Sequence, residues 1–109
     1  MVTRAAIEAL YRFSPFIEQS CQQDSELPQR LIDADRLERT TPEHEYRTLL
    51  KQRLKSVSND PQLSTLLRSF RREEMVRIAL RDLAGWGDYH SPVEELSALA
   101  EVILSETLD

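Results

Sequence analysis

The chain has 109 residues and a mass of 12.7 kDa, a size that fits a single domain. Its net charge of −5 argues against a nucleic-acid partner, because nucleic acids attract basic surfaces. The sequence contains no run of 18 apolar residues and no secretion signal pattern, so it predicts no membrane span. A single cysteine, Cys21, excludes an internal disulfide bond and a cysteine-rich zinc site. We therefore expect a soluble, cytoplasmic protein whose partners include neither a nucleic acid nor a membrane.

The positions of the prolines predict an all-α bundle of about five or six helices. Four of the five prolines follow a residue that commonly caps helix N-termini, as Ser14-Pro15, Thr41-Pro42, Asp60-Pro61 and Ser91-Pro92. The capping side chain accepts a hydrogen bond from a backbone N–H, and proline suits the first helical position. No alternating β-branched run competes with this pattern. The sequence predicts helices over residues 3–13, 15–22, 27–35, 42–57, 61–84 and 92–108.

The last two predicted helices end differently. Gly85 follows residues 61–84 and is typical of a helix C-terminus. The helix over 92–108 has no glycine, proline or basic last turn at its end, so we expect the bundle to be truncated inside it. Its predicted core stripe comprises Val93, Leu96, Leu99, Ala100, Ile103 and Leu104, and its solvated face Glu94, Glu95, Glu101 and Glu106.

The helix over 61–84 carries all five basic residues of the second half of the chain. One stripe of this helix begins with Leu63, Leu66, Leu67 and Phe70 and continues into Glu74, Arg77 and Arg81. The remaining circumference after residue 74 is largely apolar, which indicates burial inside a larger structure. Buried arginine needs paired acceptors, and Arg77 has Glu73 four residues and Glu74 three residues before it.

Two interpretations of these charges remain open. They form a structural ion-pair network, or some arginines face a phosphate or a neighbouring domain. Within the second interpretation we favour the domain, because no glycine loop offers backbone N–H groups to a phosphate. The candidate ion-pair or interdomain residues are Arg68, Arg71, Arg72, Glu73, Glu74, Arg77 and Arg81.

No pattern in the sequence is typical of a catalytic, cofactor-binding or metal-binding site. His44 and His90 have no second ligand at metal spacing, and we expect both to be solvated. Cys21 follows an apolar pattern without a basic neighbour, so we expect a small core residue. The pair Asp33 and Asp35 would need a strand to present both carboxylates to a metal ion, and we expect a helix there. We therefore expect no catalytic, cofactor-binding or metal-binding residue in this chain.

Three segments resemble one known family. The stretch 67–85, LRSFRREEMVRIALRDLAG, resembles the L-R-x-F-R-R-x-x-M-x-R-I-A-x-R-D-L-x-G segment of glutamate-ammonia-ligase adenylyltransferases, the glutamine synthetase adenylyltransferase/adenylyl-removing enzymes. Residues 97–101, SALAE, resemble the next helix of that family, and residues 13–17, FSPFI, resemble a helix start near its N-terminus. The similarity is specific over 67–101 and weak over 24–60.

The resemblance implies that residues 1–109 form a helical N-terminal segment ahead of an adenylyl-removing nucleotidyltransferase domain. Family members are large bacterial cytoplasmic enzymes that add AMP to glutamine synthetase from ATP and remove it by phosphorolysis, with Mg²⁺, under control of a PII signalling protein. The S-D-x-D signature of the family is absent here, so no catalytic residue is carried over. The expected partners are the remainder of the enzyme, glutamine synthetase and the PII protein. The alternative is a stand-alone helical interaction adaptor.

Overall fold

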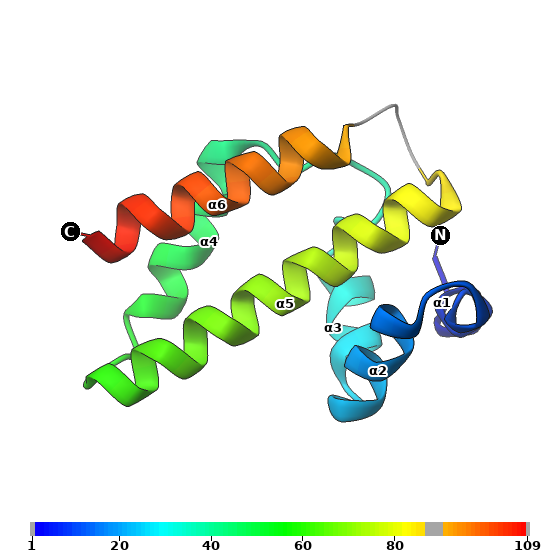
Figure 1. The fold of residues 1–109 in the computed structure, drawn as a ribbon, viewed down its shortest axis with the longest axis horizontal. Coiled ribbons are helices and arrows are strands. Elements are labelled where there is room, and N and C mark those ends of the chain that lie inside the picture. The colour runs from blue at the N-terminus through cyan, green and yellow to red at the C-terminus, as the bar shows by residue number, and fades with distance from the viewer. Residues whose placement is uncertain (1, 87–90, 109) are drawn as a thin grey trace.

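The computed structural model describes residues 2–86 and 91–108, and within these ranges the fold is all-α (Figure 1). Its α-helices are α1 (Arg4–Glu8), α2 (Pro15–Gln23), α3 (Leu27–Asp33), α4 (Glu43–Leu54), α5 (Asp60–Ala84) and α6 (Pro92–Leu108), with a 3-10 turn at Tyr11–Phe13. The predicted all-α class is therefore confirmed. None of the described helices is long and apolar enough to cross a membrane.

Two of the four predicted N-caps are confirmed. The hydroxyl of Ser14 accepts from the backbone N–H of Ile17, and that of Ser91 accepts from Glu94. The C-terminal prediction also holds, because Gly85 ends α5 in the left-handed conformation with a φ of 68°.

The other two predicted N-caps are wrong. Asn59, not Asp60, caps α5 by accepting from the N–H of Gln62 at 2.9 Å, and Asp60 is the first helical residue. Helix α4 begins at Glu43 without a side-chain cap. The Thr41 hydroxyl is not available to cap α4, because it accepts hydrogen bonds from Arg36 instead.

The predicted helix over 3–13 is also interrupted. Helix α1 ends at Glu8, and the N–H of Leu10 bonds to the carbonyl of Ile7 at 3.0 Å. The N–H of Phe13 then donates to the carbonyl of Leu10 at 3.0 Å, and this bond between residues three apart forms the 3-10 turn. Ser14 then adopts an extended conformation ahead of Pro15, which starts α2 in a new direction.

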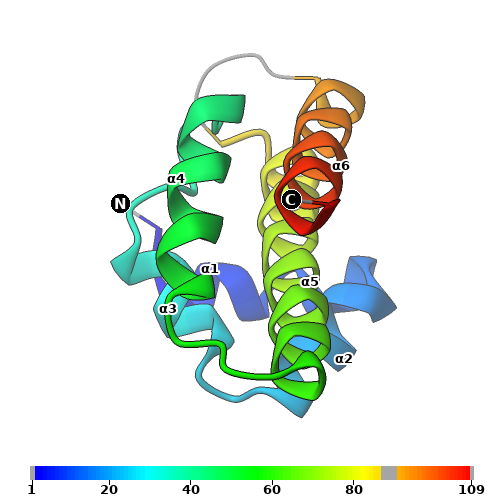
Figure 2. The same ribbon diagram turned by 90° about the vertical axis from the view of Figure 1, so that its left-hand side faces the viewer.

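Helix α5 divides the apolar interior into two clusters (Figure 2). The first cluster lies among α1, α2, α3 and the C-terminal half of α5, and contains Ile7, Ile17, Leu27 and Leu80. The second lies where α4 and α6 pack on each other and on α5, and contains Tyr46, Leu50, Phe70, Leu99 and Val102. The C-terminal half of α5 is thus buried by this chain's own helices rather than by a further domain.

The predicted orientation of α6 is partly wrong. Leu99 is buried as expected, but Val93, Leu96 and Leu104 are 71%, 38% and 56% exposed. Glu95, expected in solvent, is only 2% exposed. The helix is rotated about its axis relative to the apolar stripe, because burying Glu95 places its carboxylate against arginines of α5.

Candidate functional site

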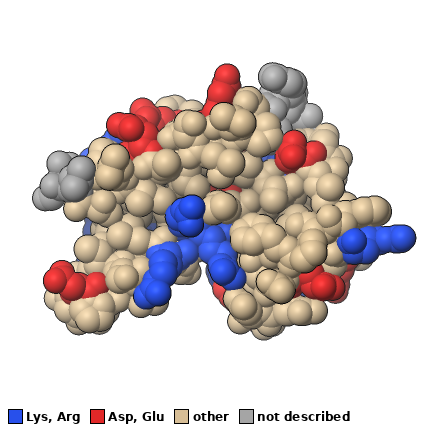
Figure 3. Space-filling model, viewed as in Figure 1, with Lys and Arg blue, Asp and Glu red and all other residues tan. Residues whose placement is uncertain are grey.

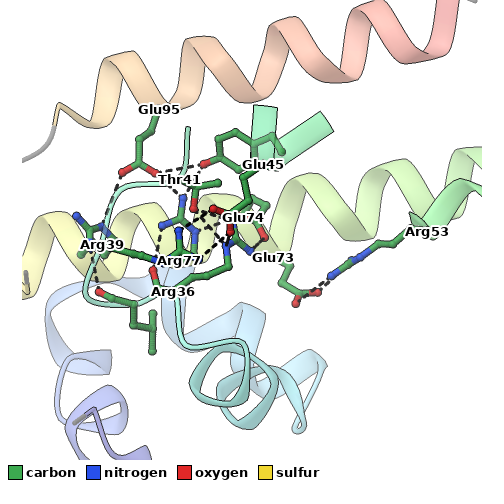
Figure 4. A network of polar contacts seen from close by, with 12 residues as sticks. Arg36, Arg39, Thr41, Glu45, Arg53, Glu73, Glu74, Arg77 and Glu95 are labelled. Atoms are coloured by element: carbon green, nitrogen blue, oxygen red, sulfur yellow. Dashed lines mark hydrogen bonds and ion pairs between the residues drawn. The ribbon is translucent and has the colours of Figure 1, made fainter. Parts of the chain in front are cut away.

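A buried polar network lies between the two apolar clusters and joins α4, α5, α6 and the segment 34–42 (Figure 4). We call it the arginine network, and its members are Arg36, Thr41, Tyr46, Glu74, Arg77, Arg81 and Glu95. All are no more than 6% exposed. Glu74, Arg77 and Arg81 come from one stripe of α5, since residues three and four apart share a helix face.

Arg77 is at the centre of the arginine network. Its Nε donates to Glu74 Oε1 at 2.9 Å, and its Nη2 donates to the Tyr46 hydroxyl at 2.6 Å and to Glu95 Oε2. The Tyr46 hydroxyl in turn donates to Glu95 Oε2. Nη1 donates to the Arg36 carbonyl. One guanidinium therefore connects α5 to α4, to α6 and to the segment after α3.

Arg36 holds the segment after α3 against α5. Its Nη1 and Nη2 donate to the two Glu74 oxygens at 3.0 and 2.6 Å, a bidentate pair. Its Nε and Nη2 donate to the Thr41 hydroxyl, and its Nε lies 3.2 Å from Glu45 Oε2. Such planar, two-point contacts fix geometry as well as contributing energy.

Arg81 extends the arginine network by one helical turn. Its Nη1 donates to the Leu37 carbonyl at 3.2 Å, and its Nη2 donates to the Thr40 hydroxyl at 3.4 Å. Its Nε lies 3.7 Å from Glu95 Oε1. Glu95 of α6 is therefore shared between two arginines of α5.

Electrostatics favour the charged form of Glu74 in the arginine network and of the neighbouring Glu45. Burial alone raises the pKa of Glu74, but the guanidinium groups of Arg36 and Arg77 outweigh burial and hold the pKa below its ordinary value. Arg39 likewise lowers the pKa of Glu45, whose carboxylate accepts hydrogen bonds from both Nη groups of Arg39. For Tyr46, burial dominates and raises the phenol pKa. The hydroxyl therefore stays protonated and remains a donor to Glu95.

The structure divides the seven residues singled out from the sequence into three groups. Glu74, Arg77 and Arg81 enter the arginine network. Glu73 does not pair with Arg77; its carboxylate lies 3.4 Å from Arg53 and 3.5 Å from Arg30, on the other side of the helix stripe. The remaining arginines, Arg68, Arg71 and Arg72, are exposed.

Sequence reasoning missed Arg36, Thr41, Tyr46 and Glu95. Arg36 and Glu74 are 38 residues apart and Arg77 and Glu95 are 18 apart, so no local spacing rule connects them. The Thr41-Pro42 pair had a simpler interpretation as a helix start. A signal for Glu95 existed, however: Arg81 has no acidic residue three or four positions away on its own helix, so its partner had to come from another element.

The arginine network connects the chain's own elements with one another. Its guanidinium groups are directed at protein acceptors and shielded from solvent, so they offer no surface to a substrate. Cys21 is buried in the first apolar cluster, as expected, and burial raises its thiol pKa. His90 lies outside the described residues. In the described part of the chain, no three His, Cys, Asp or Glu side chains are grouped in a way that could hold a metal ion.

Replacing Arg77 by methionine tests the arginine network. We expect Arg77→Met to lower the free energy of unfolding by about 3–5 kcal/mol, because Glu74 and Glu95 keep buried charges with fewer donors. Urea unfolding followed by circular dichroism measures this change. The matched control is Arg71→Met on the exposed side of α5, for which we expect about 0.5 kcal/mol or less. Equal effects of the two substitutions would contradict the assignment.

The lowered pKa of Glu74 predicts a loss of stability in acid. The stabilisation is fully present above the unfolded-state pKa of about 4.3 and is lost as pH falls through the lower folded-state value. We therefore expect Glu74→Gln to be less stable than the parent chain at pH 7, with the difference shrinking below about pH 4. Urea midpoints across pH 2–7 measure it, with exposed Glu101→Gln as control. A difference that stays constant with pH would refute this prediction.

Comparison with known proteins identifies the family. Residues 5–109 match the family model described as glutamate-ammonia ligase adenylyltransferase. Proteins named bifunctional glutamine synthetase adenylyltransferase/adenylyl-removing enzyme are similar to it: that of Nitrosococcus oceani is 38% identical over 95 residues, and that of Nitrosomonas eutropha is 28% identical over 109. These matches cover 87% and 98% of this chain but 10% and 12% of the relatives.

No solved structure matches the chain significantly. The chain spans about a tenth of the length of the two relatives described above. Because the family model covers nearly all of its residues, the chain belongs to the glutamate-ammonia ligase adenylyltransferase family.

Proposed function

We propose that this chain serves as a non-catalytic helical part of a bifunctional enzyme that adenylylates and deadenylylates glutamine synthetase, and that it supports the adenylyl-removing domain. Family membership and the roughly ninefold greater length of the relatives support this proposal. In this proposal the chain lies ahead of that domain, as the resemblance implies. ATP and Mg²⁺ would then be bound by other parts of the larger protein.

A stripe of exposed apolar residues on α6 carries the proposal. Val93, Leu96, Ala100 and Leu104 are all exposed and recur at the spacing of one helix face. We call them the α6 stripe. The opposite face of α6 packs on α4 and α5, and none of these side chains belongs to either apolar cluster. An exposed row of this kind marks a surface that another protein segment covers.

The remainder of the larger enzyme is the occupant that fits best. The relatives contain roughly nine times as much protein outside the matched region as within it. The apolar second half of α5 offers less surface, because Val76, Ile78 and Leu80 are buried within the chain and only Leu83 is exposed among the large apolar residues of 75–83. The α6 stripe instead gathers three exposed large apolar side chains, Val93, Leu96 and Leu104, on one helix face.

A chimera tests the proposal. The matching segment of the Nitrosococcus oceani relative is replaced by this chain, and release of AMP from adenylylated glutamine synthetase is measured. We expect Leu96→Asp combined with Leu104→Asp to lower this activity about tenfold or more. Burying a leucine side chain at the contact contributes about 1.5–3 kcal/mol, and the aspartate variants lose this contribution. The same pair in the isolated chain should lower its unfolding midpoint only slightly, because Leu104 is 56% and Leu96 38% exposed there.

The control is Thr48→Asp combined with Gln52→Asp, two exposed positions of α4 that are not part of the α6 stripe. Unchanged activity of the α6 variant, with binding of glutamine synthetase or the PII protein lost instead, would favour a docking surface for those partners. Unchanged activity and binding would support the stand-alone adaptor and reject the proposal.

A further inference from the structure

A second polar feature lies outside the arginine network, in a groove between α2, α3 and α5. It has a volume of about 310 Å³, and we call it the arginine groove. Figure 3 shows basic side chains gathered over the middle of α5, beside a hollow in the lower edge of the molecule. The residues lining the arginine groove are Ser20, Gln23, Asp24, Leu27, Arg30, Arg68, Ser69, Arg72 and Glu73.

The two carboxylates of the arginine groove are already neutralised by neighbouring arginines. Asp24 accepts from both Nη groups of Arg30, at 3.2 and 2.5 Å. Glu73 lies 3.4 Å from Arg53 and 3.5 Å from Arg30. The positive charges of Arg30 and Arg53 thus balance the negative charges of Asp24 and Glu73.

Arg68 and Arg72 are left with unbalanced charge. In the described ranges neither is paired with a carboxylate. Arg72 donates from Nη1 to the Gln23 amide oxygen at 2.7 Å, which holds its guanidinium across the groove toward α2. Arg68 makes one long contact, 3.5 Å, to the Ser64 carbonyl. Each guanidinium has five N–H donors, so most donors of both side chains remain available to a ligand.

Ser20 supplies an independent observation. Its side chain is 1% exposed, and among the described residues its hydroxyl has no hydrogen-bond partner. A buried polar group without a partner is uncommon and calls for an explanation. Ser20 lines the same groove from α2, across from the arginines of α5, so an oxygen of a bound ligand would provide the missing acceptor.

We propose that the arginine groove binds a small phosphate monoester, whose phosphate contacts Arg68, Arg72 and Ser20. A phosphate monoester carries a charge of about −1.5 to −2 at pH 7 and three acceptor oxygens, which matches two unbalanced guanidiniums and a hydroxyl from another direction. A carboxylate ligand carries only about half this charge. Arg68 and Arg72 would therefore hold it less strongly beside the negative charges of Asp24 and Glu73. The volume of the groove leaves room for the alcohol part of the ester. This proposal does not depend on the α6 stripe.

Titration of the chain with phosphates tests the proposal. Glycerol 1-phosphate and inorganic phosphate are added at constant ionic strength set with chloride, and binding is followed by calorimetry and by NMR signals of the arginine Nε–H groups. We expect saturable binding of the monoester that is at least as tight as that of inorganic phosphate. Arg68→Gln and Arg72→Gln should each weaken it about tenfold or more, and Ser20→Ala about threefold.

The matched control is Arg71→Gln, which removes the same charge from the exposed surface of α5 but does not line the groove. Circular dichroism verifies that each variant keeps its helices, as expected for exposed arginines. If Arg71→Gln weakens phosphate binding as much as Arg72→Gln does, the binding reflects general charge attraction and the proposal is overturned. Acetate binding as tightly as the phosphates, or no saturable binding of any probe, would overturn it too.

Discussion

The fold depends on one constraint: α5 presents Glu74, Arg77 and Arg81 on a stripe that the rest of the chain covers. Charges removed from water are costly unless hydrogen-bonded partners replace the solvent. The chain meets this requirement with groups from three other places, namely Arg36 after α3, Tyr46 of α4 and Glu95 of α6. Because these partners must reach specific guanidinium donors, the arginine network sets where the segment 34–42, α4 and α6 lie around α5.

This arrangement explains the unusual orientation of α6. A helix that followed its apolar residues alone would bury Leu96 and Leu104 and expose Glu95. Burying Glu95 against Arg77 and Arg81 turns the helix and leaves the α6 stripe outside. The ion pairs that bury Glu95 inside the chain thus also leave the α6 stripe exposed, and this stripe is the surface that we propose contacts the larger protein.

The arginines of α5 thus serve on two opposite sides of the helix. Arg77 and Arg81 face inward and are satisfied by protein groups, whereas Arg68 and Arg72 face the arginine groove with most of their donors available. Net charge alone does not reveal this division, since the chain is acidic overall. What separates the two pairs is whether a carboxylate from another element reaches them.

Local sequence rules predicted the helices because their causes are local. Ser14, Asn59 and Gly85 act within a few residues of themselves, although Asn59 was overlooked in favour of its neighbour Asp60. The stripe through Phe70, Glu74 and Arg77 was visible from helical periodicity as well. The partners of that stripe were not, because Arg36 and Glu95 come from distant segments and their burial depends on how the helices pack. Thr41 shows the same limit. Its position before Pro42 is typical of a helix cap in the sequence, but its hydroxyl accepts hydrogen bonds from Arg36 in the structure.

The most direct measurement is the coupling energy between Arg77 and Glu95, which connect α5 to α6. Unfolding free energies of Arg77→Met, Glu95→Leu and the double variant form a double-mutant cycle. If the buried pair holds the two helices together, the double variant loses less stability than the sum of the single variants, by about 1–3 kcal/mol. Additivity of the two substitutions to within about 0.5 kcal/mol would contradict the central role of the arginine network.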